Sequence, residues 1–71
     1  MEQDIRNLAV GKDYLVYSQK ANRLKGIVTC CRSKATKSKW YATEFYRKGE
    51  KIYKPFYNFM ELINYIREIA K

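Results

Sequence analysis

Histidine is absent from this sequence of 71 residues, and cysteine occurs only as the adjacent pair Cys30 and Cys31. Neighbouring residues on a strand point to opposite faces, and two thiols alone do not form the usual four-ligand zinc site. The chain also lacks a glycine-rich phosphate loop and a carboxylate cluster, and a Cys nucleophile would find only Lys or Arg as an activating neighbour. We therefore expect no enzyme activity, no metal or other cofactor and no small-molecule substrate.

Long apolar runs are also missing. No stretch approaches the ~20 apolar residues that a membrane span needs. The N-terminal sequence MEQDIRNLAV has neither the basic start nor the apolar run of a signal peptide. Two small, unlinked cysteines fit a reducing compartment. These features predict a protein that is not secreted, does not bind a membrane, and is located in the cytoplasm or at the nucleoid or nucleus.

Acidic residues are scarce: 7 Asp and Glu accompany 15 Lys and Arg, which gives a net charge of +8. The excess is concentrated between Gln19 and Lys54, where eleven basic residues are opposed only by Glu44 and Glu50. A basic segment of this kind favours polyanions, either nucleic acid or an acidic protein surface. The alternative is a solvated cationic surface that keeps a small protein soluble.

The chain is short enough to form a single domain, residues 1–71. Residues 1–12 are expected to form a short helix or a flexible segment. The aromatic and β-branched content of residues 13–18 (DYLVYS) and 26–32 (GIVTCCR) predicts two strands. The Ser33–Lys39 segment has three lysines and no apolar residue larger than alanine, so it is expected to be a loop.

Residues 40–57 are expected to form a β-hairpin, because two aromatic-rich runs flank Lys48-Gly49. Pro55 lacks an amide donor and is suited only to an edge or terminal position of a strand. Residues 58–70 are expected to form a helix with Asn58 as its N-cap and Glu61 as the capping-box partner. Its apolar stripe comprises Phe59, Leu62, Ile63, Ile66, Ile69 and Ala70.

These elements predict an α+β fold: a small antiparallel sheet of three or four strands, residues 13–57, with one C-terminal helix packed on one face. The other face of the sheet stays open. A loop of Lys48-Gly49 would place Phe45 opposite Ile52, whereas a loop of three residues would place Tyr46 there. The first register exposes Glu44 and Tyr46 on the open face, and the second exposes Tyr41, Thr43 and Arg47. Lys51 and Tyr53 lie on the open face in both registers.

An open face of Lys, Arg and Tyr beside a lysine-rich loop suits a phosphate backbone, because cations neutralise phosphates and tyrosine donates hydrogen bonds or stacks on bases. For the loop lysines the alternative is a solvated loop, and for Tyr53 it is cross-strand packing. The residues predicted to bind nucleic acid are Arg32, Lys34, Lys37, Lys39, Arg47, Lys51, Tyr53 and Lys54.

Three stretches, CRSKATKSKWYATEFY, KGEKIYK and FMELINYI, give residues 26–69 the order strand, basic loop, strand, glycine turn, strand, helix. This order resembles a group of small DNA-binding domains. The group includes methyl-CpG-binding domains, the plant ethylene-response-factor domain and the N-terminal arm-binding domains of tyrosine integrases. The resemblance implies a three-stranded sheet that docks in the major groove and is backed by one helix.

The resemblance to methyl-CpG-binding domains fails at their key positions when the sequences are aligned on Gly49. Cys31 and Tyr53 stand where those domains have their two base-reading arginines. Thr43 and Tyr41 stand where they have the tyrosine and the aspartate that frame the methyl groups. The strand at residues 13–18 has no counterpart in these families. The resemblance therefore implies DNA binding without methyl-CpG recognition, with Arg32 as the one base-reading arginine.

Three functions remain open. The first is a small regulatory or architectural module that binds double-stranded DNA. The second is a small protein of a phage or mobile element that binds and inhibits an acidic protein partner. The third is RNA or single-stranded DNA binding, with Trp40, Tyr41, Tyr46 and Tyr53 as stacking rings. A basic face with interleaved polar residues would favour nucleic acid, whereas an apolar patch ringed by charge would favour protein.

Overall fold

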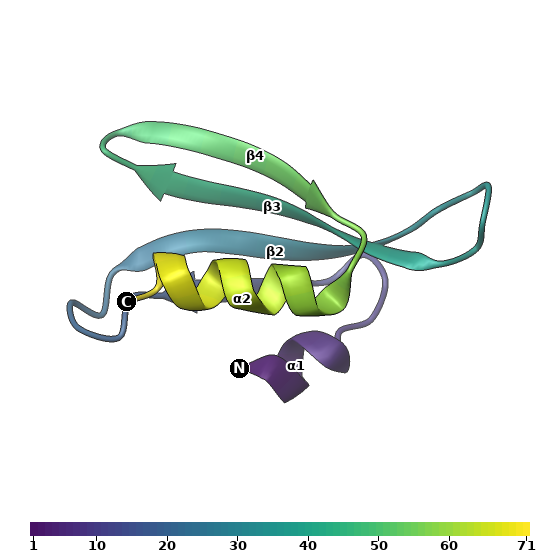
Figure 1. Cartoon of the computed structure of the whole chain (residues 1–71), viewed down its shortest axis with the longest axis horizontal. Helices are drawn as coiled ribbons and strands as arrows, with labels where there is room; N and C mark the ends of the chain where they lie inside the picture. Colours follow the sequence, from purple (N-terminus) through teal and green to yellow (C-terminus); the bar gives the residue numbers. More distant parts are fainter.

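The computed structural model describes residues 1–71. Its elements follow the order α1 (Glu2–Arg6), β1 (Asp13–Tyr17), β2 (Leu24–Arg32), β3 (Lys39–Arg47), β4 (Glu50–Phe56) and α2 (Phe59–Ile69). The strands form one antiparallel sheet in the order β1-β2-β3-β4, and α2 lies across one face (Figure 1). The chain is therefore a small α+β domain, as predicted, and the sheet has four strands.

The β3–β4 hairpin has the shorter of the two loops that the sequence allows. Arg47 pairs with Glu50 and Phe45 pairs with Ile52, so the loop is Lys48-Gly49 alone. Lys48 and Gly49 have φ values of 50° and 81°. Two positive φ values are typical of a type I′ turn, whose twist matches that of the strands it joins. The prediction that Lys51 and Tyr53 lie on the open face is confirmed.

Pro55 lies on β4, as expected for a residue without an amide donor. It pairs with Ala42 of β3, and β4 is an edge strand with β3 as its only neighbour in the sheet. The missing N–H therefore removes no bond between two interior strands.

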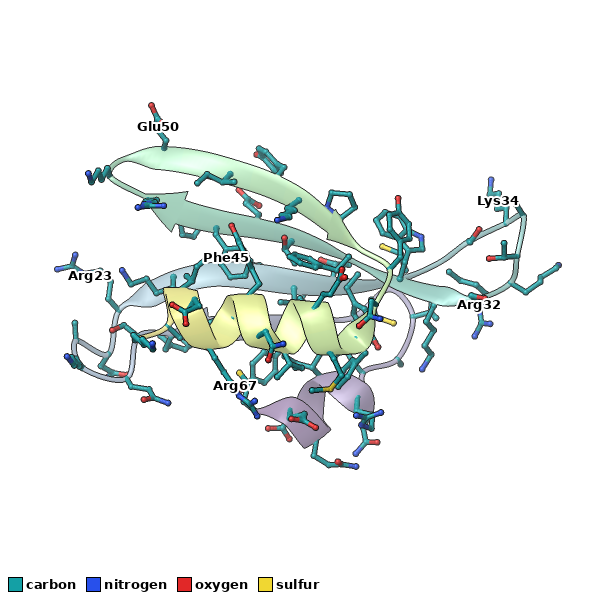
Figure 2. The ribbon with its side chains drawn as sticks, viewed as in Figure 1. Arg23, Arg32, Lys34, Phe45, Glu50 and Arg67 are labelled. Carbon is teal, nitrogen blue, oxygen red and sulfur yellow. The ribbon has the colours of Figure 1, made fainter.

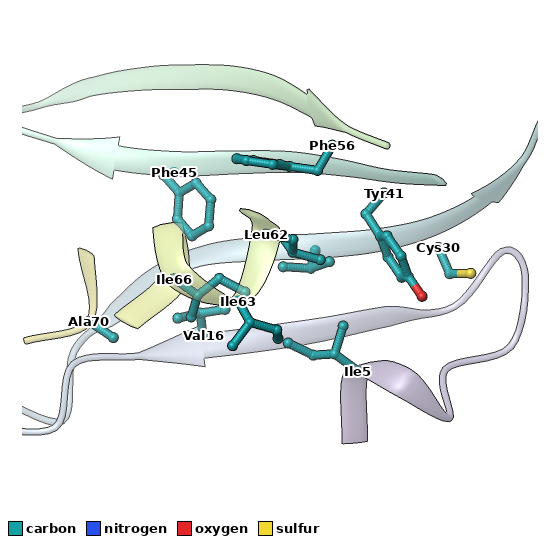
Figure 3. Close-up of a cluster of buried hydrophobic side chains, with 11 residues drawn as sticks. Ile5, Val16, Cys30, Tyr41, Phe45, Phe56, Leu62, Ile63, Ile66 and Ala70 are labelled. Atoms are coloured by element: carbon teal, nitrogen blue, oxygen red, sulfur yellow. The ribbon is translucent and has the colours of Figure 1, made fainter. Parts of the chain in front are cut away.

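The core lies between the sheet and the helices (Figure 3). Burial alternates along β2 and β3, so that every second side chain faces α2. The core cluster comprises Ile5, Val16, Val28, Cys30, Tyr41, Phe45, Phe56, Leu62, Ile63, Ile66 and Ala70. The half-buried Tyr65 of α2 joins it, with its ring centroid 5.3 Å from that of Phe45 and 5.2 Å from that of Phe56.

Gly26 of β2 allows the Phe45 ring to pack directly on the sheet. The two residues are paired across β2 and β3. A Cβ added at Gly26 would lie 2.3 Å from Phe45 Cδ1 and 2.6 Å from the Glu44 carbonyl oxygen. No larger residue fits there without a shift of the ring and of the backbone.

The predicted cap and stripe of α2 are both present. Asn58 is the N-cap, and its Oδ1 accepts a hydrogen bond from the Glu61 amide at 3.1 Å. Leu62, Ile63 and Ile66 are buried against the sheet. Burial of this stripe orients the helix, so that Met60 and Glu61 face solvent.

The N-terminal segment contains a short helix, α1, that completes the core beside α2. Ile5 is fully buried. Arg67 Nη2 of α2 lies 3.0 Å from Glu2 Oε1, and the Arg6 guanidinium lies 4.2 Å from the centre of the Phe59 ring. Neither helix is long and apolar enough to cross a membrane.

Candidate nucleic-acid interface

The β2–β3 hairpin extends beyond the rest of the sheet as a two-stranded ribbon, residues 31–40 (Figure 1). The pairs Cys31–Trp40 and Arg32–Lys39 have no neighbour in β1 or β4. The pairing of β1 with β2 ends at Thr29, and the pairing of β4 with β3 ends at Tyr41. On the other side, the segment before β1 reaches only as far as Cys30, through the hydrogen bond from Gly11 N to Cys30 O at 2.8 Å. We call residues 31–40 the ribbon.

The tip of the ribbon, residues 33–38, is held by hydrogen bonds within the loop. The Ser33 amide donates to the Ser38 carbonyl at 2.9 Å, and the Lys37 amide donates to the Ser33 carbonyl at 2.9 Å. Arg32 Nη1 donates to the Lys37 carbonyl at 2.8 Å. One guanidinium donor thus fixes the loop, and the others stay available.

The ribbon carries four cations and no acid: Arg32, Lys34, Lys37 and Lys39. None of them takes part in an ion pair. Lys39 Nζ lies 3.4 Å from the Leu8 carbonyl, while Lys34 points away from the body of the molecule (Figure 2). Lys39 belongs to β3, so the loop ends one residue earlier than predicted. The positive charge of the ribbon is therefore uncompensated by any acid of the ribbon or by an ion pair.

An aromatic pair lies where the ribbon joins the sheet. The rings of Trp40 and Tyr57 stack with centroids 5.7 Å apart at an angle of 27°. Trp40 is half-buried, whereas Tyr57 is 75% exposed and covers Trp40 from the solvent side. Tyr57 was not among the predicted stacking residues, because its contact with Trp40 depends on the strand register. The pair places an exposed ring next to the cations of the ribbon.

The open face of the sheet does not have the predicted excess of positive charge. It comprises Asp13, Leu15, Tyr17, Lys25, Ile27, Thr29, Cys31, Trp40, Ala42, Glu44, Tyr46, Lys51, Tyr53 and Pro55. Its two lysines, Lys25 and Lys51, are balanced in charge by Asp13 and Glu44, and it contains no arginine. The prediction of a basic open face is therefore wrong, because the observed register places Glu44 rather than Arg47 there.

Lys51, one of the two open-face lysines, is already paired. Its Nζ lies 3.4 Å from Glu44 Oε1, which also accepts a hydrogen bond from the Tyr53 hydroxyl at 3.4 Å. The hydrogen bond and charge of Glu44 raise the pKa of Lys51. Asp13 is likewise engaged, since Thr29 Oγ1 donates to its Oδ1 at 2.7 Å. Lys51 and Tyr53 are thus on the predicted face but bound to an acid.

Two further residues that were predicted to bind nucleic acid lie on the other side of the sheet. Arg47 and Lys54 share the face that α2 covers, because side chains alternate along β3 and β4. The Lys54 ammonium lies 4.8 Å from the centre of the Tyr65 ring and shields the edge of the core. The eight predicted residues therefore do not form one surface.

Tyr41, one of the four predicted stacking rings, is not available for bases. It faces the core, where its ring centroid lies 6.0 Å from that of Phe59 and the residue is buried. Burial raises the pKa of its hydroxyl.

The two cysteines point to opposite faces, as expected: Cys30 is buried, and Cys31 is half-buried on the open face. Burial raises the pKa of the Cys30 thiol, and the nearby Lys39 partly offsets this.

A second group of cations lies at the opposite end of the sheet, where β2 and β3 part. Their pairing stops at Gly26 and Phe45, although β2 begins at Leu24 and β3 continues to Arg47. We call this region the fork, residues 23–25 and 45–49. Its cations are Arg23, Lys25, Arg47 and Lys48, and none forms an ion pair. Of these four cations, only Arg47 is among the residues that the sequence predicted to bind nucleic acid.

Comparisons with known proteins identify no relative: no protein family, no curated protein and no solved structure matches this chain. The resemblance to small DNA-binding domains therefore stays a prediction. The structure contains no group of three or more His, Cys, Asp or Glu side chains that could hold a metal ion.

Proposed function

We propose that the protein binds double-stranded DNA and that the ribbon makes the main contact. The observation that carries this proposal is the set of four cations on a protruding two-stranded element that contains no acid. The open face contributes less, because its lysines are balanced by Asp13 and Glu44.

The shape of the ribbon suits a DNA groove. The major groove, roughly 12 Å wide, admits a two-stranded β-ribbon. Lys34, Lys37 and Lys39 would then lie close to the phosphates that border the groove. Arg32 holds the loop through the Lys37 carbonyl and would use its remaining donors on a phosphate or on a base edge.

Most of this affinity would come from phosphates, which position a protein on DNA but carry no sequence information. With one arginine near the groove, we expect a weak sequence preference and a strong salt dependence. An architectural or broadly acting regulatory role follows more naturally from such a surface than recognition of a single site.

Single-stranded nucleic acid is a second candidate, and the Trp40–Tyr57 pair supports it. An exposed tyrosine ring beside lysines is the arrangement on which unpaired bases stack. The two candidates differ in what Tyr57→Ala does. It should weaken single-strand binding strongly and duplex binding little.

Two variants with equal loss of charge test the proposal. The ribbon variant carries Lys34→Gln, Lys37→Gln and Lys39→Gln, and the fork variant carries Arg23→Gln, Lys25→Gln and Arg47→Gln. Each would be titrated against a labelled random duplex and its single strand, with fluorescence anisotropy as the readout. Circular dichroism would confirm that both variants fold.

We expect wild-type duplex affinity to fall about 40-fold between about 50 and 200 mM salt, as three phosphate contacts would produce. The ribbon variant should bind on the order of tenfold more weakly or worse at the lower salt, and the fork variant nearly as well as wild type. Equal losses in both variants would show a bulk charge effect and contradict the ribbon assignment. No duplex binding at the lowest salt would refute the proposal, and tight binding of the single strand alone would favour the stacking candidate.

A further inference from the structure

An open cavity of about 710 Å³ lies at the fork, between the ends of β2 and β3 and the last turns of α2. Half of the twelve residues that line it are apolar: Leu24, Phe45, Tyr46, Ile52, Tyr65 and Ile69. Ile52, Tyr65 and Ile69 are half-buried, so apolar surface faces this cavity without cover. Small-ligand sites in proteins typically have volumes of about 300–1,000 Å³, so the space is large enough for one or two side chains of a partner.

The cavity exists because the two hairpins separate at Gly26 and Phe45. Beyond this pair, Leu24 of β2 is paired only with Tyr17 of β1, and Tyr46 of β3 is paired only with Lys51 of β4. The β3–β4 hairpin then extends past α2, which runs beneath β2 (Figure 1). The Phe45 ring over Gly26 and the Tyr65 ring against Phe45 close the inner end.

The rim of the cavity is strongly cationic. Arg23, Lys25, Arg47 and Lys48 all line it, and none has an acidic partner. The one acid that lines it is Glu68, which is paired with Lys71 at 3.3 Å. Figure 2 shows Arg23 at this end, on the side of the β1–β2 connection. A cavity lined by both apolar and cationic side chains is complementary to an apolar group flanked by carboxylates.

We propose that the fork binds an acidic peptide segment of a partner protein. An aliphatic or aromatic side chain of the segment enters the cavity between Ile52 and Tyr65, and flanking Asp or Glu carboxylates pair with Arg23, Lys25 and Arg47. Guanidinium groups are suited to this task because they bind carboxylates through two parallel hydrogen bonds. Tyrosine and arginine are also frequent anchors of protein interfaces.

The concave shape and the apolar residues of its lining distinguish this site from the ribbon. A phosphate backbone needs cations on an accessible surface, and it gains nothing from Phe45, Ile52 or Ile69. A peptide gains from both features, since the apolar side chain supplies buried area and the carboxylates supply orientation. The inference does not depend on DNA binding, because the fork and the ribbon lie at opposite ends of the sheet.

Selection of a displayed library of random peptides on the immobilised full-length protein tests this inference. The enriched peptides would then be synthesised with a fluorescent label and titrated against wild type, the fork variant, the ribbon variant and Ile52→Thr. Ile52→Thr keeps a β-branched residue in β4 but removes apolar surface from the cavity. The ribbon variant is the matched control, because it loses the same charge as the fork variant.

We expect the enriched peptides to carry one large apolar residue between acidic residues. They should bind the fork variant and Ile52→Thr at least tenfold more weakly than wild type, and the ribbon variant equally well. Failure to enrich any peptide would overturn the inference, as would enriched peptides without acidic residues or with equal affinity for the fork variant. Duplex DNA would also be added to the peptide complexes of wild type and of the ribbon variant. If the DNA displaced the peptide equally from both proteins, the fork would be assigned to nucleic acid instead.

Discussion

The two ends of the sheet carry similar charge in opposite shapes. At the ribbon, β2 and β3 stay paired beyond their neighbours and present four cations on a convex, protruding element. At the fork the same two strands part, and four cations surround a cavity that Phe45, Ile52 and Ile69 line. The net charge of the chain predicts a polyanionic partner but does not distinguish these two ends. Their shapes do, because a groove of DNA accepts a ribbon and a cavity accepts a side chain.

The largest effect is expected from Gly26→Ala, which disturbs the pair where the two hairpins separate. The added Cβ would lie 2.3 Å from the Phe45 ring and 2.6 Å from the Glu44 carbonyl oxygen. Overpacking typically costs about 1–3 kcal/mol, and we expect a fall in the free energy of unfolding near the upper end of this range, because the Cβ meets a backbone atom as well as a ring. Urea denaturation followed by circular dichroism would measure it.

Gly11→Ala is the control for this variant. A Cβ at Gly11 meets nothing within 4 Å, and its cost comes only from the φ of 86°. We expect a loss of about 1 kcal/mol there. If Gly26→Ala were no more costly than Gly11→Ala, the close packing of Phe45 on Gly26 would not hold.

Alkaline pH is expected to destabilise the core next to the ribbon. Burial raises the pKa of the Cys30 thiol and of the Tyr41 hydroxyl. A pKa raised in the folded state contributes stability that is present below the unfolded value and is lost as the pH rises through the folded value. The free energy of unfolding should therefore be constant through neutral pH and fall above the ordinary thiol value of 9.0.

Cys30→Ala isolates the contribution of the thiol to this pH dependence. Without the Cys30 thiol, the free energy of unfolding should begin to fall only near pH 10.0, the ordinary pKa of tyrosine. Denaturation curves recorded at a series of pH values would compare the two proteins. Identical pH profiles for wild type and Cys30→Ala would show that the thiol does not contribute.

Arg32→Lys sharpens the assignment of the ribbon, because it keeps the charge and removes the guanidinium that donates to the Lys37 carbonyl at 2.8 Å. A lost hydrogen bond of this kind costs about 0.5–1.5 kcal/mol, so we expect duplex affinity to fall about two- to tenfold. Arg47→Lys makes the same exchange at the fork and should leave duplex affinity unchanged. Anisotropy titration would measure both, and a wild-type affinity for Arg32→Lys would mean that the loop needs no such anchor.

The smallest effect is expected from Lys48→Asn at the turn of the β3–β4 hairpin. Lys48 has a φ of 50°, a conformation that asparagine adopts more readily than lysine. The variant should raise the free energy of unfolding by roughly 0.5 kcal/mol. A decrease in a urea titration would contradict the type I′ assignment.

Most of the fold follows from local patterns in the sequence. The apolar stripe of α2, its Asn58 cap and the glycine of the hairpin turn each act over a few residues, and the structure confirms them. The strand register does not follow in this way. Loops of two and of three residues both fit the segment, and the two-residue loop of the structure is the one in which Phe45 packs over Gly26.

The candidate interface could be predicted only where it is local. The cations of the ribbon are close together in sequence, so composition alone reveals the loop. The charge balance of the open face depends on the β3–β4 register, because a shift of one residue would turn Glu44 away from this face and Arg47 toward it. The fork and the Trp40–Tyr57 pair bring together residues far apart in the chain, and no local pattern marks such contacts. A glycine opposite an aromatic residue, Gly26 and Phe45, is the one signal that could have pointed to the fork.

The ribbon is proposed to contact double-stranded DNA. A titration of the ¹⁵N-labelled protein with an unlabelled duplex, followed through its amide NMR signals, tests it most directly. The amides of residues 31–40 should shift first and furthest, while those of residues 23–25 and 45–49 should stay near their free positions. Shifts centred on the open face at Leu15, Ile27 and Tyr53, or at the fork, would contradict it.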